Sequence, residues 1–532
     1  MKKITKLVTM LAAALIMGAF LLPAYGCTPR REVLRIYNWG YYMNPDVMRS
    51  FETWYQSRFG TRIRVRETTF TSNEEMFRQI RDNRSDFDIA VPSDYMVSKM
   101  FAADLLQPLD RDIITDEVLG RIYQPLLNNT NSVTGTTSES LAAGGNIYAL
   151  PYLWGTMGIM FDSSIIRYEY IDFWGWEALF REIPAERNPA VGPPALTEAG
   201  FAAVAANSNF LNDRIYMKNS FRDSMVAAQL YARRNQLLEL SDGGNDWSGD
   251  DYQALLRQIF HYAPNHENAA DIDPEIRARY NITTQNNIGV YDTIFRRQRA
   301  LDSFFKYEVD VGMIEMMDGL DNRGFMGIFW SCDAGYVVPF NPDLAYHIPR
   351  EGSNLYVDAM VIPVHARNPE AANWFLYYLN MFDADNPENS AAWRNMSYVG
   401  APAGVAGAMD AFRDGLEDGT ARLMVFGYMG DEGMTLDELF SDDDGLLIVG
   451  GSDGLTVKDM FIGSIMFPDQ GVVNRTEYMR DWGAAVEVDL ALMWADILAY
   501  QPGTGCGSGS IAAGLLMLLP AALFVGVMKR RR

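Results

Sequence analysis

The sequence is poor in the residues that build cysteine- or histidine-based sites. Its 532 residues include only three cysteines, Cys27, Cys332 and Cys506, and no two of them form a CxxC pair. The four histidines are scattered along the chain, and none belongs to an HExxH motif. A dense disulfide framework and a cysteine-built zinc site are therefore excluded, and we expect no metal site.

Motifs for nucleotide cofactors are also missing. No GxxxxGK[ST] is present and no GxGxxG follows a strand-like segment, so we expect no cofactor. Basic residues are in the minority, with 45 Lys and Arg against 68 Asp and Glu and a formal net charge of −23. A chain of this charge repels nucleic acid, whereas it is compatible with a cationic small molecule.

The two ends of the chain carry export and anchoring signals. Residues 1–26 combine a basic start, an apolar run and small residues before Cys27, which predicts a secretory signal peptide. A cysteine at the cleavage point resembles that of a bacterial lipoprotein, so Cys27 is a candidate for lipidation, and ordinary cleavage before Cys27 also fits. Residues 510–528 form an uncharged run before four basic residues, which predicts a C-terminal transmembrane or sorting helix. We therefore expect the body at the cell envelope, membrane-anchored on the periplasmic or extracellular face.

The body begins with alternating strand-like and helix-like segments. Residues 33–37, 62–66 and 87–92 read as strands, and Pro45 and Ser72 open the two helices between them. This alternation predicts an α/β fold with parallel βαβ units in a sheet that is covered on both faces. Ligands of such sheets collect in the loops beyond the carboxyl ends of the strands.

The loops after these strands are rich in aromatic residues rather than in phosphate-binding glycines. Residues 38–42 contain one tryptophan and two tyrosines, and further aromatic segments follow at 152–154, 329–330 and 356–358. Aromatic faces attract organic cations, and carboxylates accept charged N–H bonds from them. The loops therefore suit an organic amine.

Ordered segments of the chain resemble the polyamine-binding proteins of bacterial ABC importers, which bind spermidine and putrescine. The segments follow one another in the family's order through nearly the whole body, at 34–39, 87–95, 148–155, 221–223, 327–330, 356–363 and 477–485. Each segment alone is weakly specific, and the ordered set is specific. Two stretches, roughly 237–320 and 403–465, are longer than the family usually has, and no role is assigned to them.

The resemblance implies a two-lobed periplasmic-binding-protein fold with the ligand cleft between the lobes. Lobe 1 would comprise 32–159 and 357–405, and lobe 2 would comprise 160–356 and 406–500. The implied function is that of a receptor, not an enzyme, which delivers a polyamine or a related small organic cation to ABC permease subunits.

Carried over residue by residue, the resemblance implies a site of aromatic, hydroxyl and acidic side chains. These residues are Trp39, Tyr42, Ser93, Tyr95, Asp223, Trp330, Tyr356, Asp358 and Tyr398. The two acids would hold ammonium groups, while the tryptophans and Tyr356 would flank the methylene chain.

Three residues depart from the family pattern. Tyr41 and Ser220 stand where many members have an acid, and Met479 stands where a polar amide contacts an amine. The aromatic residues are thus kept while the number of carboxylates falls. A putrescine-like diamine therefore fits better than spermidine, which carries three ammonium groups.

Two other functions stay open from the residues alone. Glu315 and Asp318 are three apart and would share one face of a helix, so an envelope enzyme acting on an amine or a carbohydrate could use them as acid and base. A ligand-binding envelope sensor would bind the same amine and signal to a partner. Ligand recovered unchanged favours a receptor over an enzyme.

Overall fold

The computed structural model describes residues 32–500 with internal gaps. The gaps fall at 83–85, 138–139, 141–143, 185–191, 209, 212–213, 263, 265–269, 284–286, 301–308, 319–323, 426–431 and 441–453. The predicted signal peptide, Cys27 and the predicted helix at 510–528 lie outside the described residues. Within the residues described, no helix is both long and apolar enough to cross a bilayer.

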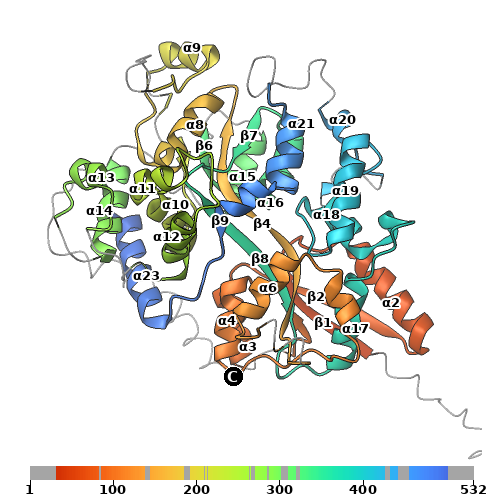
Figure 1. Ribbon diagram of the computed structural model, residues 1–532. Helices are drawn as coiled ribbons and strands as arrows, with labels where there is room; N and C mark the ends of the chain where they lie inside the picture. The colour runs from red at the N-terminus through yellow and green to blue at the C-terminus, as the bar shows by residue number, and fades with distance from the viewer. Residues whose placement is uncertain are drawn as a thin grey trace, which may run out of the picture.

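Nine strands of the described residues form one mixed sheet (Figure 1). The strands are β1 Glu32–Trp39, β2 Ile63–Phe70, β3 Ile89–Ala90, β4 Ala149–Asp162, β5 Ile215–Tyr216, β6 Met326–Trp330, β7 Leu344–His347, β8 Ser353–Val361 and β9 Thr476–Glu477. Their order is β2-β1-β3-β8-β4-β6-β5, with β7 paired to β4 and β9 paired to β8. We call the end formed by β2, β1 and β3 lobe 1, and the end formed by β6, β5 and β7 lobe 2.

Helices pack around both ends of this sheet (Figure 1). Those of the first half of the chain are α2 Pro45–Phe59, α3 Asn73–Arg81, α4 Asp94–Ala102, α5 Asp116–Gly120, α6 Gln124–Ser132, α8 Tyr168–Trp174, α9 Glu198–Ala206, α10 Phe221–Ala232, α11 Arg234–Leu240 and α12 Asp250–His261. Those of the second half are α13 Pro274–Arg279, α14 Asn287–Ala300, α15 Val309–Asp318, α16 Ser331–Val337, α17 Pro369–Leu379, α18 Ala391–Val399, α19 Ala406–Asp418, α20 Leu436–Leu439, α21 Val457–Met460, α22 Gln470–Asn474 and α23 Ala484–Ala499.

The N-terminal elements form as their sequence predicts. Asn44 caps α2 by accepting the Asp46 N–H, and Pro45 takes the first helical turn, where its missing N–H costs nothing. Ser72 caps α3 in the same way. Strand β1 pairs in parallel with both β2 and β3, so the predicted parallel βαβ unit is confirmed.

The centre of the sheet departs from that expectation. Strand β8 pairs antiparallel with β3 and with β4, and β4 pairs antiparallel with β6. Every residue of β4 and of β8 is buried, so neither strand shows the polar alternation from which a direction or a partner could be predicted. The strands that join the two lobes therefore add antiparallel pairing to the parallel units predicted for the N-terminal segment.

Strands β4 and β8 run through both lobes. Residues 149–156 of β4 pair with β8, whereas 157–161 pair with β6 of lobe 2. The chain thus passes from one lobe to the other within single extended strands. The lobe boundaries at 159–160 and 356–357 fall inside these two strands and stay a prediction.

The described parts of the two long stretches add helices to this frame. In the first, α12 and α14 pack beside α10, and the ring of Phe295 lies 5.4 Å from that of Trp494 on α23. In the second, α19 packs against α18. Both stretches therefore extend the packed body around the sheet.

Candidate functional site

The strand ends of the two lobes meet midway along β4. Leu153 lies opposite Asp358 of β8, Gly155 lies opposite Tyr356, and Met157 lies opposite Trp330 at the end of β6. Ser93, which follows β3 and precedes α4, forms a single bridge with Asp358. Residues from both lobes thus converge where the shared strands cross between them.

Asp358 is the central residue of the part of the candidate site that lies in lobe 1, which we call the lobe 1 half. Its side chain accepts a hydrogen bond from the Tyr42 hydroxyl at 2.8 Å and one from the Ser93 hydroxyl at 2.6 Å. The residue is only 5% exposed. Three residues separated by up to 316 positions in the chain are thereby joined around one carboxylate.

The Asp358 carboxylate lacks a cationic partner among the described residues. Within the described residues, no lysine, arginine or histidine forms an ion pair with it. Burial raises the pKa of Asp358 from 3.8 to about 6, although the hydrogen bonds from Ser93 and Tyr42 oppose the shift. A buried carboxylate of this kind is destabilised in its charged form until a cation approaches.

Neighbouring side chains hold the two hydroxyl donors in place. The Tyr152 hydroxyl donates to the Tyr42 carbonyl at 2.7 Å. The side-chain amide of Asn73 donates to the Ser93 hydroxyl at 3.1 Å and accepts the Ser93 N–H at 3.2 Å. Tyr42 and Ser93 are therefore each anchored by a further side chain.

Two aromatic rings stand beside this carboxylate. Tyr356 and Trp330 meet edge to face with their centroids 4.9 Å apart. Gly155 permits this approach, because a Cβ there would lie 2.6 Å from the Tyr356 hydroxyl. The pair lies two residues along β8 from Asp358, and aromatic faces of this kind attract organic cations.

The lobe 2 half of the candidate site contains two acids, Asp223 and Asp333, and one lysine, Lys218. Lys218 follows β5, and its Nζ lies 3.1 Å from Asp333 Oδ2 and 4.7 Å from the centroid of the Trp330 ring. Burial raises the pKa of Asp223 to about 6, and the nearby charges of Lys218 and Arg222 oppose the shift. The Asp223 carboxylate forms no ion pair within the described residues.

An ion-pair network joins the two lobes beside the site. Glu487 of α23 accepts from Lys99 of lobe 1 at 2.5 Å and from Arg222 of lobe 2 at 2.6 Å. The Arg222 guanidinium also lies 4.0 Å from the ring centroid of Tyr95, whose hydroxyl donates to Glu74. Tyr95 therefore lies at the contact between lobes.

Two further predicted site residues, Trp39 and Tyr398, pack in the hydrophobic core near the site. Trp39 ends β1, and its ring packs 4.4 Å from that of Phe70 at the end of β2. Tyr398 lies on α18 in the same buried cluster as Tyr42 and Tyr152. The structure thus joins Tyr42, Ser93 and Asp358 directly, and joins Trp330 to Tyr356. A ligand-binding role for the nine residues stays a prediction.

The three departures from the family pattern fall in different environments. Tyr41 is 64% exposed in a left-handed conformation with φ of 58°. Ser220 caps α10 by accepting the Asp223 N–H, and Met479 is buried in the hydrophobic core. None of the three supplies a carboxylate at these places.

Sequence reasoning missed several charged residues around the site. Lys218, Asp333 and Glu487 had no recognisable signal, apart from the strand-then-helix pattern that places Asp333 in the first turn of α16. Asp94 is 2% exposed, and burial raises its pKa from 3.8 to about 7, with Arg480 opposing the shift. Asp94 is therefore a third buried carboxylate near Asp358, in addition to the two acids that the sequence predicted.

Other features offer less to a cationic ligand. Glu315 accepts a hydrogen bond from Tyr216 at 2.6 Å, whereas the side chain of Asp318 lies outside the described residues. Across the parts of the chain that are described, no group of three His, Cys, Asp or Glu could hold a metal ion.

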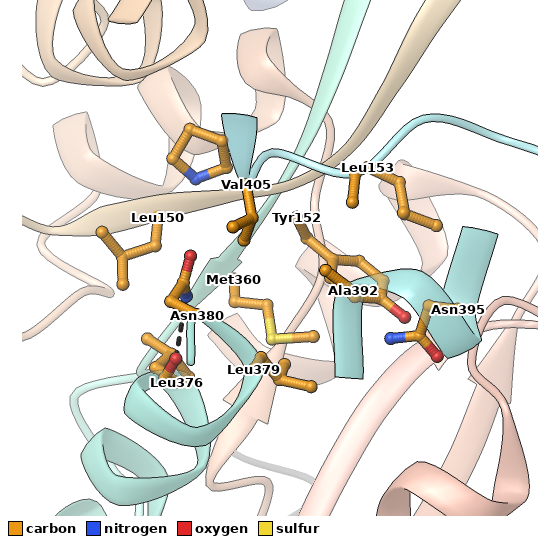
Figure 2. A pocket seen from close by; sticks show the side chains of 12 residues that line it. Leu150, Tyr152, Leu153, Met360, Leu376, Leu379, Asn380, Ala392, Asn395 and Val405 are labelled. Carbon is orange, nitrogen blue, oxygen red and sulfur yellow. Dashed lines mark hydrogen bonds between the residues drawn. The ribbon is translucent and has the colours of Figure 1, made fainter. Parts of the chain in front are cut away.

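Figure 2 shows a pocket in lobe 1, between β4, β8, α17 and α18. Its wall is largely apolar, with Met360, Leu376 and Leu379 among the lining residues, and its polar side chains include Asn380 and Asn395. No carboxylate lines this pocket. It therefore offers no charge that would hold an ammonium group.

Comparison with known proteins gives relatives of one kind. The putrescine-binding periplasmic protein SpuD of Pseudomonas aeruginosa is 25% identical over 285 residues, which cover 49% of this chain and 68% of that protein. The spermidine/putrescine-binding periplasmic protein of Salmonella typhimurium is 20% identical over 357 residues, covering 65% of this chain and 72% of the relative. No protein-family model matches the chain.

Solved structures agree on the fold. The spermidine/putrescine ABC transporter substrate-binding protein PotD of Streptococcus pneumoniae superposes with a TM-score of 0.50 at 19% identity, covering 88% of this chain and 99% of that one. The two-lobed α/β fold of the periplasmic binding proteins is therefore confirmed. The chain's similarity to bacterial polyamine-binding proteins, predicted from the sequence, is confirmed as well.

Proposed function

We propose that this protein is the substrate-binding receptor of an ABC importer and that its cargo is a short diamine of the putrescine type. The observation that carries the proposal is the buried Asp358 carboxylate, which is hydrogen-bonded by two hydroxyls and has no ion-pair partner within the described residues. An ammonium group would stabilise the charged form of this acid and would lie near the aromatic pair of Trp330 and Tyr356.

The second carboxylate of the proposed site is Asp223. It lies in the first turn of α10 in lobe 2, and burial raises its pKa, which favours pairing of its charged form with an ammonium group. One ammonium at Asp358 and one at Asp223 satisfy a diamine that lies across the junction of the lobes. The names of the relatives, which bind putrescine or spermidine, support the same class of cargo.

The proposed mode of action is closure of two lobes around the cargo. Tyr42, Tyr95, Tyr356 and Asp358 are each less than 9% exposed, so a ligand reaches them only when the lobes separate. Such opening and closing lets a buried site fill and empty. The closed complex would then deliver its cargo to the permease subunits of the importer.

The proposed location is the cell envelope, on the periplasmic or extracellular face. The relatives are periplasmic by name, which supports this placement. Attachment to the membrane through a lipid on Cys27, through a helix at 510–528, or through both, is part of the proposal.

Calorimetric titration of the detergent-solubilised full-length protein with putrescine, cadaverine, spermidine and spermine tests the function. We expect putrescine or cadaverine to bind at least tenfold more tightly than spermidine, a difference of about 1.4 kcal/mol. Tighter binding of spermidine would overturn the diamine preference. Absence of binding by all four amines would overturn the polyamine function.

A further inference from the structure

Lys218 is a buried lysine within the lobe 2 half of the candidate site. Its side chain is 3% exposed, and its Nζ lies 3.1 Å from Asp333 Oδ2. Burying an ammonium group costs several kcal/mol unless the charge is paired and hydrogen-bonded, so its place in the fold is held by specific partners. The groups around the Lys218 ammonium therefore indicate which kind of ligand group this part of the site can stabilise.

The surroundings of the Lys218 ammonium are those of an amine-binding site. The Nζ lies 4.7 Å from the centroid of the Trp330 ring, which contacts Tyr356 edge to face. Its charge also lowers the pKa of Asp223, against the rise that burial causes. An aromatic face and two acids thus surround a primary ammonium group supplied by the protein itself.

The lobe 1 half differs in this respect. Asp358 accepts hydrogen bonds from the hydroxyls of Tyr42 and Ser93 and forms no ion pair within the described residues. Asp358 thus needs a cation from the ligand, while Asp333 of the lobe 2 half already has one in Lys218. A third ammonium group on a ligand would compete with Lys218 for Asp333.

We propose that Lys218 is a specificity-determining residue that occupies an amine position in the site and so restricts the cargo to amines with at most two ammonium groups. The inference rests on the proposed function, because it names the residue that limits the length and charge of that cargo. A longer polyamine would bring its additional ammonium next to the Lys218 ammonium, where the like charges repel and Asp333 is already paired with Lys218.

The test measures the ratio of putrescine affinity to spermidine affinity rather than either affinity alone. Calorimetry with full-length protein would compare the wild type with Lys218→Met, Lys218→Gln and Lys218→Arg. We expect both uncharged variants to shift the ratio at least tenfold towards spermidine and Lys218→Arg to shift it less than threefold. Lys218→Gln retains a hydrogen-bond donor for Asp333, so it provides the uncharged variant if Lys218→Met does not fold.

Lys99→Met is the matched control. Lys99 also pairs with a carboxylate, Glu487, but it lies in the contact between the lobes rather than against Trp330. We expect its loss to leave the affinity ratio unchanged. An unchanged ratio in the uncharged Lys218 variants, with putrescine still bound, would overturn this inference and leave the proposed function intact. A wild-type protein that binds no amine would overturn both.

Discussion

In lobe 1 the buried carboxylate of Asp358 is met by two neutral hydroxyls, whereas in lobe 2 the carboxylate of Asp333 is met by the ammonium of Lys218. Both acids lie beside the same aromatic pair, so the difference is one of charge rather than of shape. An acid that is already paired gains little from a ligand, and an acid that is buried without a cation gains much. The lobe 1 half is therefore expected to dominate the binding energy.

Asp358→Asn should have the largest effect on binding. The substitution keeps the shape of the side chain and removes the charge that meets the ammonium, so putrescine affinity should fall by about 2–4 kcal/mol, roughly 30- to 900-fold. Calorimetry measures the change. Asp273→Asn is the matched control, because Asp273 is also a fully buried acid but lies in lobe 2, hydrogen-bonded to Asn235 and Gln236. Equal affinity in the wild type and in Asp358→Asn would remove Asp358 from the site.

The stability of the ligand-free protein should depend on the protonation of Asp358. The folded-state pKa of about 6 exceeds the value of 3.8 for an unperturbed aspartate, so the folded protein binds more protons between these pH values. The stabilising contribution of the protonated acid is full below about pH 4 and is lost as the pH rises through 6, an effect of about 3 kcal/mol.

Denaturant unfolding of the wild type and of Asp358→Asn at pH 4, 5, 6 and 7 measures that contribution. The difference between their pH dependences isolates Asp358 from the other acids, including Asp94 and Asp223. We expect saturating putrescine to reduce the wild-type protein's loss of unfolding free energy as the pH rises. Parallel pH dependences of the two proteins would contradict a perturbed Asp358.

The two hydroxyl donors should contribute less than the carboxylate itself. Tyr42→Phe and Ser93→Ala each remove one hydrogen bond to the charged form of Asp358, which should lower putrescine affinity by about 1–2 kcal/mol. Tyr168→Phe is a control that loses a hydroxyl contact with His347 elsewhere in lobe 2. Putrescine affinity could stay unchanged in Tyr42→Phe and Ser93→Ala while Asp358→Asn still lowers it. That result would show that the two hydroxyls do not stabilise the charged form of Asp358.

The ion-pair network between the lobes should have the smallest effect. Glu487→Gln leaves Lys99 and Arg222 without their shared acid, which should disfavour the closed form by about 1–2 kcal/mol, between the values for exposed and buried pairs. Small-angle scattering without ligand should then show a larger radius of gyration. Glu177→Gln breaks ion pairs with Arg181 and Arg279 of lobe 2 alone, so its curve should match the wild type. An unchanged curve for Glu487→Gln would mean that other contacts hold the lobes together.

Local patterns predicted the N-terminal part of the fold. Period-two alternation identified β2, and Pro45 and Ser72 marked the starts of α2 and α3, because these signals depend only on nearby residues. The pairing of β4 with β8 could not be predicted, since both strands are buried throughout.

The residues of the candidate site could be predicted only where the sequence resembles the polyamine-binding proteins. Tyr42, Ser93 and Asp358 were named from matching segments, but their mutual hydrogen bonds join parts of the chain that are hundreds of residues apart. Lys218 follows the two-residue strand β5, which is too short to show a periodicity, and it matched no motif. Its pairing with Asp333, 115 residues away, needed the fold.

The most direct test of this account is the number of protons released when putrescine binds. Calorimetry at pH 6 in buffers of different ionisation enthalpy gives this number for the wild type and for Asp358→Asn. At its pKa of about 6 the Asp358 carboxyl is half protonated, and an approaching ammonium favours the charged form. Wild-type binding should therefore release about 0.5 proton more than binding to the variant. Equal proton release by the two proteins would contradict a direct pairing of the ligand ammonium with Asp358.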